Sequence, residues 1–265
     1  MVSIEPASNT ESALSTLVEE RARTDAEKRA FASFRTRVAD VECERSVGRD
    51  SEMMCPTTDG GTVFRTVNRK QSCAPLIDTV VTAYRETVMA VDHYDEEFDE
   101  TLCESLAEEL TDDIAVALTC GDEFSPALQR TVCKAAETAR QDRSSFLTEL
   151  ATENESLTCA RDRLQDIAST YESLTADHPM TLTVPELSDR YAALRNLLER
   201  CEDLATARQV TLQECRPRHE HDDVSLQSYL YQSLSTNYPV LADCATLSDS
   251  IRPECRRLLR ELTER

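Results

Sequence analysis

The chain has 265 residues, of which 40% are apolar and 30% charged, and its formal net charge is −21. This composition is typical of a globular or coiled-coil protein and excludes a mostly disordered one. Nucleic acid and anionic membrane surfaces are poor partners for such a chain, because phosphate binding needs clustered Lys and Arg. No apolar run approaches the ~20 residues of a membrane span and no secretory signal is visible, so we expect no membrane segment and a cytoplasmic location.

The basic residues are biased as strongly as the acidic ones. Of 29 cations only Lys28, Lys70 and Lys134 are lysines. An acidic excess with Arg in place of Lys is typical of proteins in molar salt, where a Debye length of about 3 Å screens self-repulsion. An acidic protein from a GC-rich genome is the alternative. The high-salt interpretation predicts that molar KCl raises the melting temperature.

The first predicted helix covers residues 9–45, where apolar side chains recur at spacings of three and four. Residues 46–72 hold three of the four glycines and form a predicted connector, within which Thr62–Val67 could be a short strand. Pro75 then opens a helix that we expect to reach about Val91.

Two capping boxes mark further helix starts. Thr101 and Glu104 begin a helix that Gly121 can end, and Thr183 and Glu186 begin another. The longest predicted helix lies between them, and three short helices follow. The expected ranges are 126–176 for the longest helix, 183–215 for the next, and 223–235, 239–250 and 253–264 for the short ones.

The two long helices carry heptad patterns. The first seam runs from Phe146 to Leu174 and the second from Leu187 to Cys215. Antiparallel pairing of the seams places the one acid of the first, Glu153, opposite the one base of the second, Arg208. Registers shifted by half a heptad fit antiparallel layering better, so this register pair is a hypothesis.

We therefore predict an all-α fold, namely a long antiparallel helical hairpin or elongated helix bundle with coiled-coil character. The expected organisation is an N-terminal amphipathic helix (1–45), a Gly-containing connector (46–72) and a helical domain (73–265) that contains the hairpin (126–215).

An acidic segment is the first candidate for chemistry. Residues 86–129 contain fourteen acidic residues and no Lys or Arg. At its centre His93 is followed by Asp95 and Glu96, and carboxylates with an imidazole could bind a divalent metal. The alternatives are an acidic docking face and a solvated surface, because no Glu-x-x-His pair supports a di-iron site.

Cysteine and histidine form a second candidate metal site. Cys215, His219 and His221 lie within seven residues and could hold zinc with a ligand from elsewhere. A polar turn after a helix end explains the same cluster without a metal. The chain has eleven cysteines and no C-x-x-C, and we expect most of them to be small buried apolar residues.

No P-loop, G-x-G-x-x-G, G-x-S-x-G or H-E-x-x-H motif is present. We therefore expect no enzyme activity and no cofactor. The leading hypothesis is a non-enzymatic interaction or scaffold protein that binds a protein partner or itself. The rival is a metal-binding regulatory protein that uses the His93 segment or the Cys215 cluster.

The run Ala83–Glu100, followed by the helix to Cys120, resembles the hallmark segment of an uncharacterised haloarchaeal protein family. The Glu-Glu-Arg-Ala-Arg run at 19–23 and the stretch Tyr229–Leu241 are similar to it as well. The resemblance covers most of the chain and implies an acidic, helical protein with no known activity or ligand. The many cysteines depart from that family's usual composition, which leaves their role open.

Overall fold

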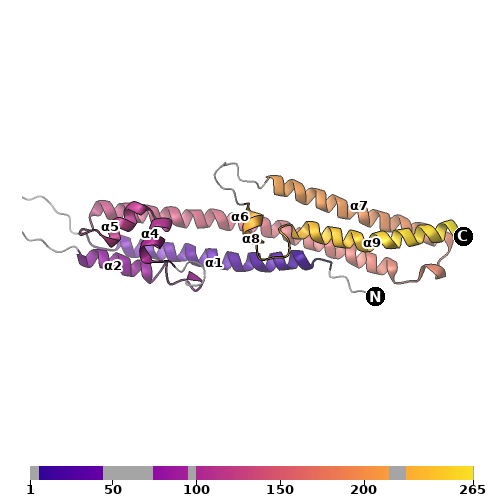
Figure 1. Ribbon diagram of the computed structural model, residues 1–265, viewed down its shortest axis with the longest axis horizontal. Coiled ribbons are helices and arrows are strands. Elements are labelled where there is room, and N and C mark those ends of the chain that lie inside the picture. Colours follow the sequence, from indigo (N-terminus) through magenta and orange to yellow (C-terminus); the bar gives the residue numbers. More distant parts are fainter. Residues whose placement is uncertain (1–5, 44–73, 95–99, 215–224, 265) are drawn as a thin grey trace, which may run out of the picture. The chain divides into compact units, whose positions relative to one another are not determined.

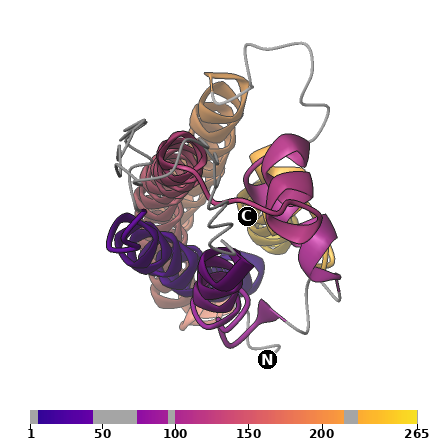
Figure 2. The same cartoon turned by 90° about the vertical axis from the view of Figure 1, so that its left-hand side faces the viewer.

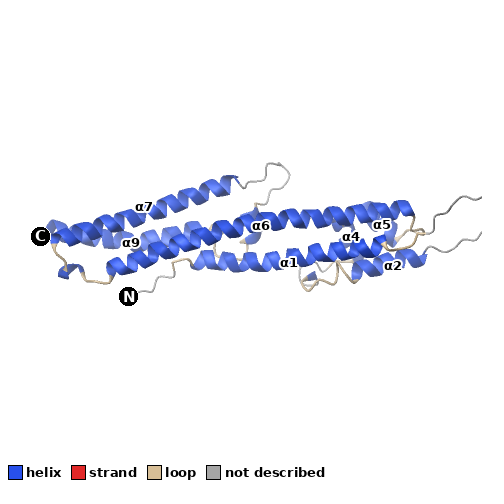
Figure 3. Cartoon of the chain, turned by 180° about the vertical axis from the view of Figure 1, so that it is seen from behind, coloured by secondary structure: helices blue, strands red, loops and turns tan. Residues whose placement is uncertain are grey.

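The computed structural model describes residues 6–43, 74–94, 100–214 and 225–264. Within these ranges the regular structure is helical and contains no strand, which confirms the all-α prediction (Figure 3). No helix among them is long and apolar enough to cross a membrane. The connector expected at 46–72, with its candidate strand, lies outside the described residues. The helices are α1 (Ser8–Ala39), α2 (Ala74–Arg85), α4 (Leu102–Glu109), α5 (Asp112–Thr119), α6 (Pro126–Thr175), the short 3₁₀ helix η1 (Pro179–Thr181), α7 (Val184–Glu214), α8 (Leu226–Leu230) and α9 (Pro239–Glu264).

The chain divides into two compact units (Figure 1). The terminal unit comprises Met1–Ala22 and Leu147–Arg265, and the central unit comprises Arg23–Phe146. Helices α1 and α6 each contribute residues to both units. The division therefore crosses α1 and α6, and the terminal unit combines the two ends of the chain.

The central unit is built on one apolar core to which α1, α2, α4, α5 and α6 all contribute (Figure 2). Phe34 of α1 and Tyr84 of α2 are fully buried and meet edge to face, with ring centroids 5.1 Å apart. The Tyr84 hydroxyl lies 2.9 Å from the Ser105 hydroxyl, so its polar atom is satisfied inside the core.

The helix predicted from Thr101 to Gly121 is two helices in the structure. The capping box at Thr101 and Glu104 forms as expected and starts α4. Thr111 then adopts an extended backbone, and its hydroxyl accepts a hydrogen bond from the amide of Ile114 to cap α5. The predicted apolar stripe is still buried, although the chain forms two short helices here and not one straight helix. Its residues are Leu106, Leu110, Ile114 and Leu118.

The terminal unit is a bundle in which α7 runs antiparallel to α6 (Figure 1). Most of the aliphatic residues of both predicted seams are buried, among them Leu150, Leu157, Leu187 and Leu194. The backbone of α7 lies close to that of α9 over much of its length, however, and comes close to α6 at few points at most. The seams thus face a core shared with a third helix.

Helix α9 corrects another expectation, since the two helices predicted at 239–250 and 253–264 form one. Pro253 lies inside it and removes one backbone donor. Continuation of the helix keeps Ile251, Cys255 and Leu258 buried on one face. The buried carboxylate of Asp243 in this helix also accepts four hydrogen bonds from the start of α1, from the backbone and side chains of Asn9 and Thr10.

Candidate functional site

The buried polar centre of the terminal unit joins α6, α7 and the segment after α8. Arg208 donates to both carboxylate oxygens of Glu153, at 2.5 and 3.0 Å, and to the Ser156 hydroxyl at 2.8 Å. The Tyr231 hydroxyl donates to the same carboxylate at 2.6 Å. Glu153 and Arg208, which the sequence places opposite each other, are therefore in direct contact.

This network is enclosed by protein. The side chains of Glu153 and Arg208 are each 4% exposed, and Tyr231 is fully buried. Burial, followed by the charge of Glu153, raises the pKa of the Tyr231 phenol. A charge-balanced pair with its hydrogen bonds satisfied stabilises one arrangement of helices and presents no reactive group to solvent.

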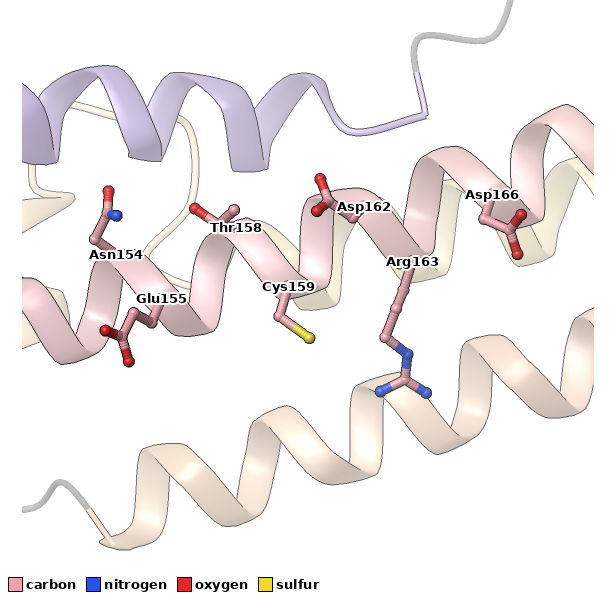
Figure 4. A pocket seen from close by; sticks show the side chains of 7 residues that line it. All are labelled: Asn154, Glu155, Thr158, Cys159, Asp162, Arg163 and Asp166. Carbon is pink, nitrogen blue, oxygen red and sulfur yellow. The ribbon is translucent and has the colours of Figure 1, made fainter.

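An open groove lies on the solvent side of the same helix (Figure 4). Its volume is about 570 Å³. In the close view Asn154 and Thr158 point toward α1, whereas Cys159 and Arg163 point toward α7. The lining residues all come from α6 and are Asn154, Glu155, Thr158, Cys159, Asp162, Arg163 and Asp166.

The chemistry of this α6 groove is mixed. Arg200 of α7 reaches Asp166 at 2.5 Å, and Arg161 bonds Asp162 at 2.7 Å, so two of its acids already have basic partners. Arg163 lies between these two acids along the helix, and the exposed thiol of Cys159 lies three residues before Asp162. Such an open surface, with charges of both signs around a small apolar residue, is suited to a macromolecular partner rather than to enclosing a small substrate.

The central unit holds a second polar cluster, and it contains the metal candidate His93. The imidazole Nε2 of His93 lies 2.9 Å from Glu27 Oε1. Arg143 donates to the other oxygen of Glu27 at 3.0 Å and to Glu109 at 2.6 Å, and its guanidinium lies over the Phe31 ring. Burial raises the pKa of Glu109 in spite of the adjacent guanidinium.

The other predicted metal ligands all lie outside the described residues, namely Asp95, Glu96, Cys215, His219 and His221. Among the residues that the structure does describe, no group of three His, Cys, Asp or Glu side chains could hold a metal ion.

The cysteines divide by environment rather than behaving as one class. No disulfide joins the described ones. Cys201, Cys244 and Cys255 are buried, as expected of small apolar residues. Burial raises the pKa of each of these thiols, for Cys244 to about 12, so they are poor nucleophiles. Cys103, Cys120 and Cys159 are exposed instead.

Sequence reasoning missed the α6 groove and two partners in the polar contacts. The groove is lined by residues of α6 alone, and their spacing matches no sequence motif. Tyr231 and Asp243 gave no signal, because each bonds a residue more than seventy positions away.

No curated protein and no solved structure matches the chain. A family model, Domain of unknown function (DUF7260), matches residues 8–255. The match spans both units and every described helix apart from the end of α9. The expectation of an uncharacterised family is thereby confirmed, and the chain belongs to the DUF7260 family.

Proposed function

We propose that this chain is a non-enzymatic, cytoplasmic protein-interaction or scaffold protein adapted to high salt, and that it binds a helical segment of a partner along the α6 groove. The groove extends from Asn154 to Asp166, about 18 Å at 1.5 Å per residue, which matches roughly three turns of a partner helix. The observation that carries the proposal is this open, mixed-charge surface on a helix whose opposite face is fixed in the core.

The rigidity of α6 supports the same interpretation. Leu150, Leu157 and Leu164 are fully buried, and Glu153 is fixed by Arg208 and Tyr231. Side chains on the outer face of such a helix keep their spacing, so the free-energy cost of ordering them when a partner binds is small. An enzyme would instead be expected to enclose its substrate in a deeper pocket with convergent polar groups.

The test is affinity capture in molar KCl from a lysate of the source organism, followed by binding of the identified partner to the purified chain. The double variant Cys159→Arg and Asp162→Lys adds bulk and reverses charge in the groove. We expect it to weaken binding about tenfold or more. The control Ser169→Arg alters an exposed position on the same helix outside the groove and should bind like the native chain.

Two results would overturn the proposal. One is a partner that binds the groove variant as tightly as it binds the native chain. The other is near-stoichiometric zinc or manganese in the purified protein, with binding lost on metal removal. That result would favour the metal-binding regulatory alternative through Cys215, His219 and His221 or the His93 segment.

A further inference from the structure

Helix α9 presents an exposed row of arginines in a chain whose net charge is −21. Arg252, Arg256 and Arg260 recur every four residues and are all exposed, so they lie on one face of the helix. This basic stripe lies away from the buried residues Ile251, Cys255 and Leu258, which fix the opposite face in the core.

The basic stripe is not neutralised by its own neighbourhood. Arg252 pairs with Asp249 at 2.8 Å, but these side chains are 52% and 75% exposed, and such a pair contributes little. In the described part of the chain, no carboxylate lies within ion-pair distance of Arg256 or Arg260. Leu259 is 50% exposed beside them, so the stripe combines positive charge with one aliphatic side chain.

The central unit carries a surface of the opposite character on α5. Asp112 and Asp113 occupy the first turn of this helix and are exposed. Val116, one turn later on the same face, is 59% exposed. We call these three residues the acidic patch. It belongs to the 86–129 segment, which contains no Lys or Arg.

We infer that the chain self-associates, with the basic stripe of one copy bound to the acidic patch of a second copy. Each surface has an exposed aliphatic residue beside charges that are mostly of one sign, with Asp249 next to Arg252 as the exception, and this is the arrangement of a small apolar contact with a polar rim. Opposite signs steer the two surfaces together, whereas stripe against stripe or patch against patch is repulsive. A solution of the pure chain also supplies both surfaces in equal amounts.

This inference goes beyond the proposed function, since it uses neither the α6 groove nor a foreign partner. At about 1 M salt the Debye length is near 3 Å, so only charges in direct contact still attract, together with Leu259 and Val116. Association should therefore be weaker in molar KCl than in dilute buffer. The same residues should form the contact under both conditions.

A charge-swap experiment tests the pairing by sedimentation velocity over a wide concentration range. The stripe variant carries Arg252→Glu, Arg256→Glu and Arg260→Glu, and the patch variant carries Asp112→Arg and Asp113→Arg. Each variant alone should associate on the order of a hundredfold more weakly than the native chain. An equimolar mixture of the two should associate again, because each reversed surface then meets a complementary one.

A second substitution guards against misfolding, because arginine in the first turn of α5 opposes the helix dipole. Leu259→Ser leaves α5 untouched and should weaken self-association about tenfold, with unchanged circular dichroism. The inference would be overturned if the native chain stayed monomeric at every concentration. This includes the case in which the basic stripe binds the acidic patch of its own chain, because no association would then be measured. Failure of the mixed variants to associate while both remain folded would overturn it as well. Neither result bears on capture of a partner at the α6 groove.

Discussion

Glu153 in the terminal unit and Glu109 in the central unit each accept a hydrogen bond from an arginine, at 2.5 and 2.6 Å. Arg208, the partner of Glu153, is 4% exposed and bonds one carboxylate. Arg143, the partner of Glu109, is 21% exposed and bonds two, since it also reaches Glu27. The enclosed site pairs one carboxylate with one guanidinium, whereas the partly exposed site places two carboxylates around one guanidinium, with the His93 imidazole beside Glu27.

The difference shows how one acidic chain handles burial in two ways. Where solvent is excluded, each charge needs an opposite charge and further hydrogen bonds, as Tyr231 and Ser156 provide around the Glu153 pair. In the central unit, where solvent is only partly excluded, burial raises the pKa of Glu109 even though the guanidinium of Arg143 lies beside it. The following substitutions separate these two cases.

The largest effect is expected for Glu153→Leu. The change leaves the guanidinium of Arg208 buried without its carboxylate and removes the acceptor of Tyr231, so the free energy of unfolding should fall by ~3–5 kcal/mol. Glu153→Leu combined with Arg208→Leu removes both charges and should recover most of that loss. Urea denaturation of the native chain, the two single variants and the double variant gives the coupling.

Additive effects in that cycle would refute the role of the pair in fixing the register of α6 and α7. Arg200→Leu is the matched control on the same helix. Its pair with Asp166 is 34% and 68% exposed, so the free energy of unfolding should change far less.

The second effect concerns Arg143→Met in the central unit. Methionine keeps the aliphatic contact with Phe31 but leaves Glu27 and Glu109 without their shared donor. Because both carboxylates retain some contact with solvent, the expected loss is ~1.5–3 kcal/mol, less than for Glu153→Leu. Thermal unfolding measures it. A loss as large as that of Glu153→Leu would show that exposure does not distinguish the two sites.

The third comparison uses two buried tyrosines. Tyr231→Phe removes a donor to a charged carboxylate, and Tyr84→Phe removes a hydrogen bond to the neutral hydroxyl of Ser105. Loss of the bond to the charged group should cost ~1.5–3 kcal/mol and loss of the neutral one ~0.5–1.5 kcal/mol. Chemical denaturation of both variants decides the order. The comparison between the units fails if Tyr84→Phe costs as much as Tyr231→Phe.

Local patterns predicted most of the helices, because helix caps and apolar periodicity depend on residues that are close together in the sequence. The capping box at Thr101 and the helix start at Pro126 are examples. The pattern failed where two solutions bury the same side chains. Residues 102–119 bury one stripe equally well as two helices, and Pro253 is tolerated because the helix around it buries its apolar face.

The site was less accessible to sequence reasoning than the fold. Glu153 and Arg208 stood out as the charged members of two apolar seams, so their pairing could be hypothesised. The packing of α9 against α7 could not be predicted, because the same leucines suit a two-helix coil and a larger bundle. The α6 groove matches no sequence motif, and the four bonds to Asp243 depend on distant segments and leave no local pattern.

The smallest effect is expected for Glu109→Gln, and it is seen in the pH dependence of stability. Burial raises the pKa of Glu109 above its usual value of 4.5. The folded state therefore holds this proton more tightly than the unfolded chain, and the contribution of the group to stability falls as the pH rises from below 4.5 through the folded pKa. Glutamine does not titrate and still accepts a hydrogen bond from Arg143. The stability of the variant relative to the native chain should therefore increase from acidic to neutral pH in urea denaturation.

Glu186→Gln provides the control of opposite sign. Hydrogen bonds from the Thr183 amide and hydroxyl lower the pKa of Glu186, so this group adds stability above pH 4.5 that is lost as the pH falls through the folded pKa. Relative to the native chain, Glu186→Gln should lose stability toward neutral pH while Glu109→Gln gains it. If both variants changed in the same direction, burial of Glu109 and capping by Glu186 would not shift the two pKa values in opposite directions as described.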